Sequence, residues 1–597
     1  MWDQDGARWD RAHKSLFLER TVIGSRLSAL PATLLASVML CGAAPAPSVS
    51  YALSPVMSDG VLTAVAVEIH LTGGADGRTE LELPDRFGGV KEHWRYLTNL
   101  RVDGASMEND GPAKRSLRHA PGGQLTVRYQ VATAYPSDPT GDDGNPYDGP
   151  AIRPGWFAAL GDFLFVKPTG RDNAPATFDW KGWPKGWTHV SDADHGSMGR
   201  PMSVGDVVES TLLAGPDVAL RTRPISGGAL RLATRGEWSW NLDRYADTMG
   251  RILSTEREFW GDVAGPFTVT LFQLSPGKSF ASSGGTGRGD GFAQYASPDV
   301  PESVLVTNIG HEHIHTWIPR RVGEMPDGGA EAGLYWFSEG FTEFYTARTL
   351  LRAGIWTPRQ FVDDLNGKLA EYASSQARTF PNARIASDFW TNPAVEQLPY
   401  RRGELFAYLL DRKLRQAGHV RGLDSLMFAM RDRWVAAPVR GKPALLANFE
   451  AAMGGLGVEA RDELKRFIDA GEPIELSPDQ FAGCATVSTT TIPSFDVGFD
   501  REATAKAGVF EGVNLQGPAY AAGLRDGMKR LARLGGHEGD SREPLAYRIE
   551  AGGSERVVHL KPEGKARLRF QEVKLASGLS KVQLARCERT MSGATEP

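Results

Sequence analysis

His311, Glu312 and His315 are the residues whose types and spacing say most about chemistry. They form the pattern H-E-x-x-H, and a largely apolar stretch at 304–309 precedes them. On a helix, positions i and i+4 share a face, so both imidazoles can bind one divalent ion while Glu312 stands beside it. The pattern predicts a metal-dependent hydrolytic site. His313 points away from this face and is predicted to be a packed or surface residue rather than a ligand.

A third ligand is needed, because a catalytic zinc usually takes three protein ligands and a water. The best candidate is Glu339, in an aromatic stretch at 336–345 that suits a second helix. The intervening residues 320–332 are rich in Gly, Pro and charge, which favours a loop between two antiparallel helices. Glu343 lies four residues after Glu339 on the same helical face. It is predicted either to accept the free ring N–H of a ligating histidine or to remain a solvated charge.

Two separated segments resemble the motifs of one family, the glycyl aminopeptidases among the gluzincin zinc metallopeptidases. They are H-E-x-x-H-T-W at 311–317 and W-F-S-E-G-F-T at 336–342. The resemblance implies a zinc ion as cofactor, one per chain, and peptides as substrates. It also implies that Glu312 is the general base, which accepts a proton from the zinc-bound water and delivers it to the leaving amine.

The same resemblance implies an oxyanion-stabilising tyrosine from a Y-x-K-G-like segment after the ligands. This chain has Tyr400 followed by Arg401, Arg402 and Gly403, so that Arg402 replaces the lysine. A helix is expected over 404–417, which places Tyr400 just before its start. The alternative interpretation of Tyr400 is a half-buried aromatic residue that caps this helix.

One part of the family pattern is altered. Aminopeptidases of this kind carry, upstream of the zinc motif, a glycine-rich strand with an acidic residue that grips the substrate's amino terminus. The corresponding stretch is 282–293, where Gly284 and Gly285 are the expected substrate-binding residues and the acidic residue after them is missing. Asp290 is the candidate substitute, whereas Arg288 is expected to repel an ammonium group. The other interpretation of this stretch is a flexible glycine loop.

Three functional hypotheses follow. The first is a zinc aminopeptidase that removes N-terminal residues from peptides, with small residues such as glycine or alanine as candidates. The second keeps the zinc chemistry but admits internal bonds through the altered glycine stretch, which gives an endopeptidase. The third is a non-enzymatic protein that binds peptide tails on a retained scaffold. The intact set of His311, Glu312, His315, Glu339 and Tyr400 argues against the third hypothesis.

A second resemblance lies in residues 490–575. The run G-P-A-Y-A-A-G-L at 517–524 resembles the PDZ signature, in which a turn leads into a short helix, and relatives of the glycyl aminopeptidases commonly carry such a domain. Val497, Gly498 and Phe499 would then form the loop whose backbone N–H groups capture a C-terminal carboxylate. C-terminal peptide tails are therefore candidate partners of this PDZ-like β domain.

Length and pattern predict a multidomain α+β protein. The chain has 597 residues, 41% of them apolar and 23% charged, with a formal net charge of -5. This size permits several cores, and the near-neutral balance gives no basic face for nucleic acid. Alternating apolar residues predict an N-terminal β-sandwich over 50–215. A thermolysin-like catalytic domain with a mostly α-helical lobe is expected over 216–475, with helices near 358–376, 404–417, 421–434 and 457–470. A tail at 576–597 follows the PDZ-like domain.

The first 46 residues are predicted to be a signal peptide or an N-terminal anchor. Several basic residues come before an apolar stretch at 27–40, and small residues follow it. We therefore expect a secreted protein, with a bacterial periplasm as the best fit. No later segment has the roughly 18 continuous apolar residues of a membrane helix. Beyond this segment two cysteines remain, Cys484 and Cys587, which either pair in an oxidising compartment or are unrelated buried residues.

Overall fold

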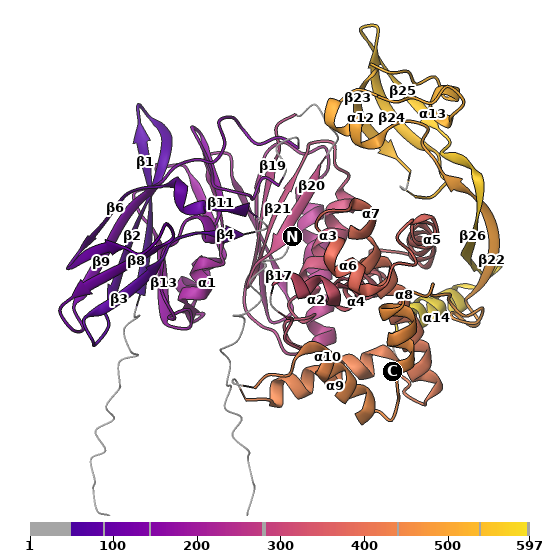
Figure 1. The fold of residues 1–597 in the computed structure, drawn as a ribbon, viewed down its shortest axis with the longest axis horizontal. Helices are drawn as coiled ribbons and strands as arrows, with labels where there is room; N and C mark the ends of the chain where they lie inside the picture. The colour runs from indigo at the N-terminus through magenta and orange to yellow at the C-terminus, as the bar shows by residue number, and fades with distance from the viewer. Residues whose placement is uncertain are drawn as a thin grey trace, which may run out of the picture.

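The computed structural model describes residues 49–593, apart from 88–89, 142–144, 277–281, 327, 439–440 and 537–538. The predicted signal or anchor segment lies outside the described residues. Among the helices that are described, none has both the length and the hydropathy required to cross a membrane. Figure 1 shows a β-rich N-terminal part, a central part in which helices cover a sheet, and a small C-terminal sheet at the end of a long β ribbon. The chain is thus a multidomain α+β protein, as predicted.

The N-terminal part consists of three main sheets, with strand orders β15-β13-β1-β2-β9-β6, β12-β3-β8-β7 and β10-β11-β16-β14. Buried and more exposed residues alternate along β2 and β9, so that one face of the first sheet lies on a core. The strands of this part and its one α-helix are β1 (Val49–Ser58), β2 (Val61–Thr72), β3 (Arg78–Glu82), β4 (Arg86–Phe87), β5 (Val90–Lys91), β6 (Leu97–Asp103), β7 (Ala105–Asn109), β8 (Lys114–His119), β9 (Gln124–Val131), β10 (Ala151–Arg153), β11 (Trp156–Leu160), β12 (Lys167–Pro168), β13 (Pro175–Trp180), β14 (Thr188–Ser191), β15 (Met202–Ser203), α1 (Val204–Val208) and β16 (Thr211–Gly215).

The central sheet has the order β17-β18-β19-β21-β20, with β18, β19 and β21 parallel and β20 antiparallel at one edge. The middle strands are buried along most of their length, as expected for a sheet covered on both faces. Helices α2 and α3 pack on one face, and residues of β11 and β16 pack on the other. The bounds are β17 (Ala219–Ile225), β18 (Gly228–Arg235), α2 (Leu242–Trp260), β19 (Phe267–Gln273), β20 (Ser283–Gly287), β21 (Gly291–Ala296) and α3 (Glu302–Ile314).

A helical lobe follows α3 and contains the largest apolar core of the described residues. Its helices are α4 (Tyr335–Arg352), α5 (Pro358–Ser374), α6 (Asn382–Asp388), α7 (Pro393–Glu396), α8 (Leu398–Gln416), α9 (Leu423–Ala436), α10 (Leu445–Gly455) and α11 (Arg461–Glu463). The helical stretch expected near 457–470 is present but starts later than predicted. Gly457 has a φ of 68°, which separates it from α10, and α11 continues directly into a π-helix at Leu464–Asp469.

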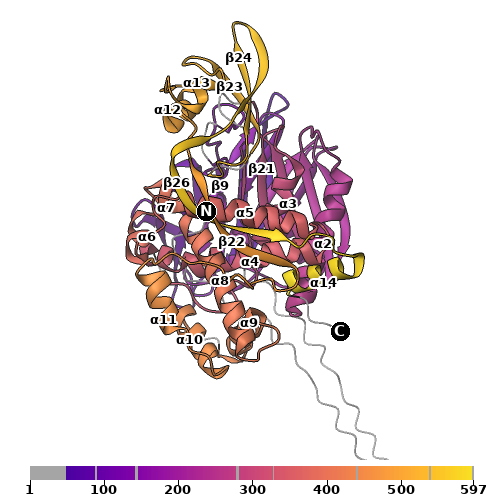
Figure 2. The ribbon, with the colours of Figure 1, turned by 90° about the vertical axis from the view of Figure 1, so that its right-hand side faces the viewer.

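The C-terminal part begins with Cys484, which forms a disulfide bond with Cys587. Of the two interpretations of these cysteines, the bridge is therefore correct. Strands β22 and β26 pair along their length, and they extend from the helical lobe to the sheet β23-β24-β25 (Figures 1 and 2). The bounds are β22 (Ala485–Phe495), α12 (Arg501–Ala507), α13 (Pro518–Ala521), β23 (Lys529–Gly535), β24 (Leu545–Ala551), β25 (Ser554–Leu560), β26 (Glu563–Leu575) and α14 (Lys581–Ser592).

Candidate metal centre

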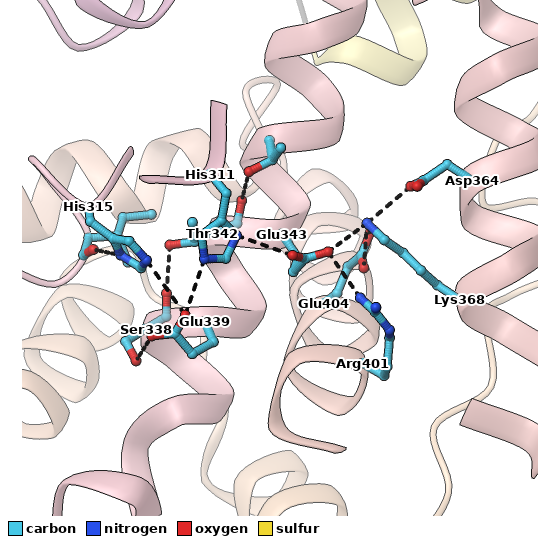
Figure 3. Close-up of polar contacts among 12 residues, drawn as sticks. His311, His315, Ser338, Glu339, Thr342, Glu343, Asp364, Lys368, Arg401 and Glu404 are labelled. Atoms are coloured by element: carbon cyan, nitrogen blue, oxygen red, sulfur yellow. Dashed lines mark hydrogen bonds and ion pairs between the residues drawn. The ribbon is translucent and has the colours of Figure 1, made fainter. Parts of the chain in front are cut away.

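The three predicted metal ligands meet where the end of α3 contacts α4. His311 lies in the last turn of α3, His315 is its C-cap residue, and Glu339 lies in the second turn of α4. Oε2 of Glu339 is 3.2 Å from Nε2 of His311 and 3.6 Å from Nε2 of His315 (Figure 3). One ligand atom from each of the three residues lies within 4.8 Å of the other two, close enough to hold one ion.

The second nitrogen of each ring has its own acceptor. Nδ1 of His315 lies 2.8 Å from the carbonyl oxygen of Ile318, and Nδ1 of His311 lies 3.1 Å from Oε1 of Glu343. An acceptor at Nδ1 places the proton there and leaves the lone pair of Nε2 for an ion that Glu339 can also bind. Two oriented imidazoles and one carboxylate form the donor set of a catalytic zinc. Of the two interpretations of Glu343, the contact with a ligating histidine is the one that the geometry supports.

The close crossing of α4 and α8 determines where the site forms. A Cβ atom on Gly403 would lie 1.8 Å from the carbonyl oxygen of Trp336, and one on Gly340 would lie 2.3 Å from Cα of Gly403. The two helices therefore touch through their backbones, and only glycine allows this approach. Since Glu339 precedes Gly340 and Tyr400 lies about one turn before Gly403, the crossing brings both side chains to the same place.

Tyr400 lies inside the first turn of α8, which begins at Leu398, and not before the helix as expected. Pro399 fits a first helical turn, where no N–H partner is needed, so the helix starts earlier than the pattern indicated. The rings of Tyr400 and His311 stack with their centroids 6.2 Å apart. Burial raises the pKa of Tyr400 well above its ordinary value, and the carboxylates of Glu339 and Glu312 raise it further. The phenol therefore keeps its proton and can donate it in a hydrogen bond.

Glu312 lies beside the edge strand β20. A Cβ atom on Gly287 would lie 3.2 Å from Oε2 of Glu312. A glycine at the end of the strand therefore avoids a close contact with this carboxylate. The interpretation of this stretch as a flexible loop is wrong, because β20 pairs residue by residue with β21. Packing against β21 explains why glycine also occupies positions 284 and 285. Added Cβ atoms there would lie 2.6 Å from Oη of Tyr295 and 2.4 Å from the ring of Phe292.

The expected repulsion of an ammonium group by Arg288 is wrong. Its side chain forms an ion pair with Asp162, and its Nε donates to the carbonyl oxygen of Glu209 at 2.5 Å. Only 5% of Arg288 is exposed, and both partners come from the N-terminal part of the chain. Asp290 forms an ion pair with Arg200, so the predicted contact of Asp290 with a substrate amine requires this pair to open.

Sequence reasoning missed Lys368 and Arg401, which contact the carboxylate of Glu343 on the side away from His311 (Figure 3). Oε2 of Glu343 lies 2.9 Å from Nζ of Lys368 and 3.0 Å from Nη1 of Arg401. Arg402, at the lysine position of the motif, is fully buried and donates instead to the carbonyl oxygens of Arg378 and Phe380. No sequence motif marks Lys368, and proximity to Tyr400 is the single signal that could have indicated Arg401.

Two other predicted groups have clear positions. His313 is fully buried, and its Nδ1 lies 2.5 Å from Glu256, so it is a packed residue and not a ligand. In the C-terminal part, Gly498 has a φ of 74° and lies against Pro518 at the start of α13. Its N–H donates to Oδ1 of Asp496 at 2.8 Å. Of the predicted carboxylate loop, Val497 and Phe499 therefore remain the candidate N–H donors.

Residues 305–398 match the family model described as M61 glycyl aminopeptidase. An aminopeptidase N family protein from Idiomarina loihiensis has a similar structure over 92% of this chain and 100% of its own, with 15% sequence identity and a TM-score of 0.63. That similarity shows the fold. An M1 zinc metallopeptidase from Deinococcus radiodurans covers 72% of this chain and 94% of its own, at 16% identity and a TM-score of 0.42. No curated protein matches the chain.

The fold and the matched segment define the class of this protein, which is a zinc metallopeptidase. The matched segment contains His311, Glu312, His315, Glu339 and Glu343, and the predicted resemblance to the glycyl aminopeptidases is thereby confirmed over residues 305–398. The PDZ resemblance stays a prediction.

Proposed function

We propose that the protein is a zinc aminopeptidase that hydrolyses the first peptide bond of peptides, with glycine or alanine among the preferred N-terminal residues. The observation that carries the proposal is the meeting of the His311, His315 and Glu339 set with Tyr400. Glu312 is the neighbour of His311 in the last turn of the same helix. The matched family segment supports peptides as the substrate class.

The residues around the three metal ligands each have a separate role in this proposal. Strand β20 is an edge strand, and an extended peptide can pair with such an edge through its backbone. Glu312 accepts a proton from the attacking water and delivers it to the leaving amine. The hydroxyl of Tyr400 donates a hydrogen bond to the oxyanion that develops on the carbonyl. When bound, a zinc ion supplies Lewis acidity to the water and to the carbonyl.

The ion pair between Asp290 and Arg200 favours a second candidate function. An aminopeptidase needs an anion for the substrate's ammonium group, and the glycine strand supplies none of its own. If Asp290 stays paired with Arg200, an internal stretch of peptide can occupy β20 and the enzyme is an endopeptidase. If the pair opens, Asp290 is available for the amino terminus.

A panel of substrates separates the two functions. Purified protein would be given aminoacyl-nitroanilides of glycine, alanine and larger residues, together with peptides whose amino termini are acetylated. Release from the free-amine substrates alone supports the aminopeptidase, and cleavage of the acetylated peptides supports the endopeptidase. Absence of turnover in zinc-loaded protein would overturn both and favour the peptide-binding hypothesis.

The C-terminal part gives the proposal a second component. Val497 and Phe499 are proposed to present backbone N–H groups to the C-terminal carboxylate of a peptide, so that this part recruits or orients substrates. The bond between Cys484 and Cys587 supports a location in an oxidising compartment, such as a periplasm or the extracellular space.

A further inference from the structure

Lys368 is a buried cation on α5, outside every motif of the sequence. Its side chain is 12% exposed, and its Nζ lies 2.9 Å from Oε2 of Glu343, 3.0 Å from Asp364 and 3.2 Å from Glu404 (Figure 3). Three carboxylates thus share one ammonium group. One of them, Glu343, is the group that contacts a metal ligand.

Among the described residues, two Lys or Arg side chains contact Glu343, namely Lys368 and Arg401. Arg401 also binds Glu371, with 2.6 Å between Nε and Oε2. In the described part of the structure, Lys368 alone joins Glu343 to Asp364 and Glu404. Its removal would leave these carboxylates facing one another at short range in a buried place, where like charges repel strongly. The carboxylate of Glu343 would then turn away from its present position.

The two oxygens of Glu343 have different partners, and this division connects Lys368 to His311. Oε1 lies 3.1 Å from Nδ1 of His311, while both cations contact Oε2. Fixing Oε2 fixes the rotation of the carboxylate, so that Oε1 stays in line with the ring. His311 then keeps its proton on Nδ1 and turns Nε2 toward Glu339.

We propose that Lys368 is a positioning residue of the metal centre, which holds Glu343 against His311 and thereby presents Nε2 of His311 to the ion. The inference concerns metal binding and rests on the proposed function only in taking the ion to be zinc. Substitutions of groups that orient metal ligands typically lower metal affinity by about 10- to 100-fold.

The test measures zinc affinity by chelator competition, without substrate, on the full chain. Lys368→Met keeps most of the side-chain volume and removes the charge, and Lys368→Gln is the second variant. Lys574→Met is the matched control, because Lys574 pairs with Glu572 at 2.8 Å on the exposed surface of β26. We expect the zinc dissociation constant to rise about 10- to 100-fold for both Lys368 variants and to stay unchanged for the control.

A double-mutant cycle separates positioning from a general effect on the fold. In a Glu343→Gln background, Lys368→Met should add little further loss of zinc affinity, because its partner is already altered. Wild-type zinc affinity in a folded Lys368 variant, or full additivity in the cycle, would overturn the proposal. Failure of both Lys368 variants to fold would also count against it, since Lys368 would then act on the fold. Because no substrate is present, the outcome does not depend on whether the protein proves to be a peptidase.

Discussion

The surroundings of Tyr400 favour the protonated form of its hydroxyl group. Tyr400 is half-buried, stacks on the ring of His311, and lies near several carboxylates that disfavour its ionised form. A protonated phenol beside His311 is a candidate hydrogen-bond donor for the proposed reaction. The alternative, a capping aromatic residue, would leave the hydroxyl without a part in turnover.

Substitution of Tyr400 by Phe removes only this hydroxyl. We expect kcat to fall about 10²- to 10³-fold, as for loss of an oxyanion donor, with KM, zinc content and thermal stability little changed. Steady-state kinetics on a cleavable peptide would measure the effect. Tyr96→Phe, in the N-terminal part, is the control, and near-normal kcat in Tyr400→Phe would remove this residue from the mechanism.

At the scale of elements, the crossing of α4 and α8 brings two distant parts of the sequence into one site. Gly340 and Gly403 allow the helices to touch, and the turns around this contact carry Glu339 and Tyr400. Arg401, next to Tyr400, reaches Glu343 on α4 and so adds an ion pair across the same crossing. The position of α8 therefore determines where Tyr400 and Arg401 lie relative to Glu339 and Glu343.

Gly403→Ala should separate the two helices, because the new Cβ atom would lie 1.8 Å from a backbone oxygen of α4. We expect a loss of about 1–3 kcal/mol in the free energy of unfolding, as for an overpacked core, together with reduced kcat. Denaturant unfolding and kinetics would measure both. Gly454→Ala on α10 is the matched control, since its Cβ atom would meet nothing within 4 Å. Unchanged stability of Gly403→Ala would contradict this account of the crossing.

For the whole molecule, the C-terminal part is joined to the helical lobe at several places along α5. Asn366 donates to the carbonyl oxygen of Val573 and accepts from its N–H, at 2.9 and 2.8 Å. Ser374 donates to the carbonyl oxygen of Gly539 at 2.9 Å. The disulfide bond between Cys484 and Cys587 joins residues that are 103 positions apart in the sequence. It links α14 to the residue that precedes β22.

Reduction of this disulfide should destabilise the C-terminal part. Removal of a native crosslink typically costs about 2–5 kcal/mol, mainly because the unfolded chain gains freedom. The melting temperature of the protein lacking residues 1–46 should therefore fall in a thiol reductant. A variant with both Cys484→Ser and Cys587→Ser should melt at the reduced value and show no response to reductant. Equal melting temperatures with and without reductant in the wild-type protein would contradict the expectation.

The metal ligands could be predicted from sequence because helical geometry alone places positions i and i+4 on one face, as in His311 and His315. The expected start of α8 is too late, because Pro399 fits the first turn of a helix and the helix therefore begins at Leu398. Lys368 carries no local signal, and its meaning depends on the packing of α5 beside α4. Arg288 was misinterpreted for a similar reason, because its partner Asp162 comes from another part of the chain.

The most direct test of the central claim compares wild-type protein with Glu312→Gln, each stripped of metal and then loaded with zinc. Bound zinc and hydrolysis of a peptide that the wild type cleaves would be measured on the same samples. We predict one zinc ion per chain in both proteins and turnover, restored by zinc, in the wild type alone. Comparable turnover by Glu312→Gln, or zinc-independent hydrolysis by the wild type, would contradict the assignment of the site.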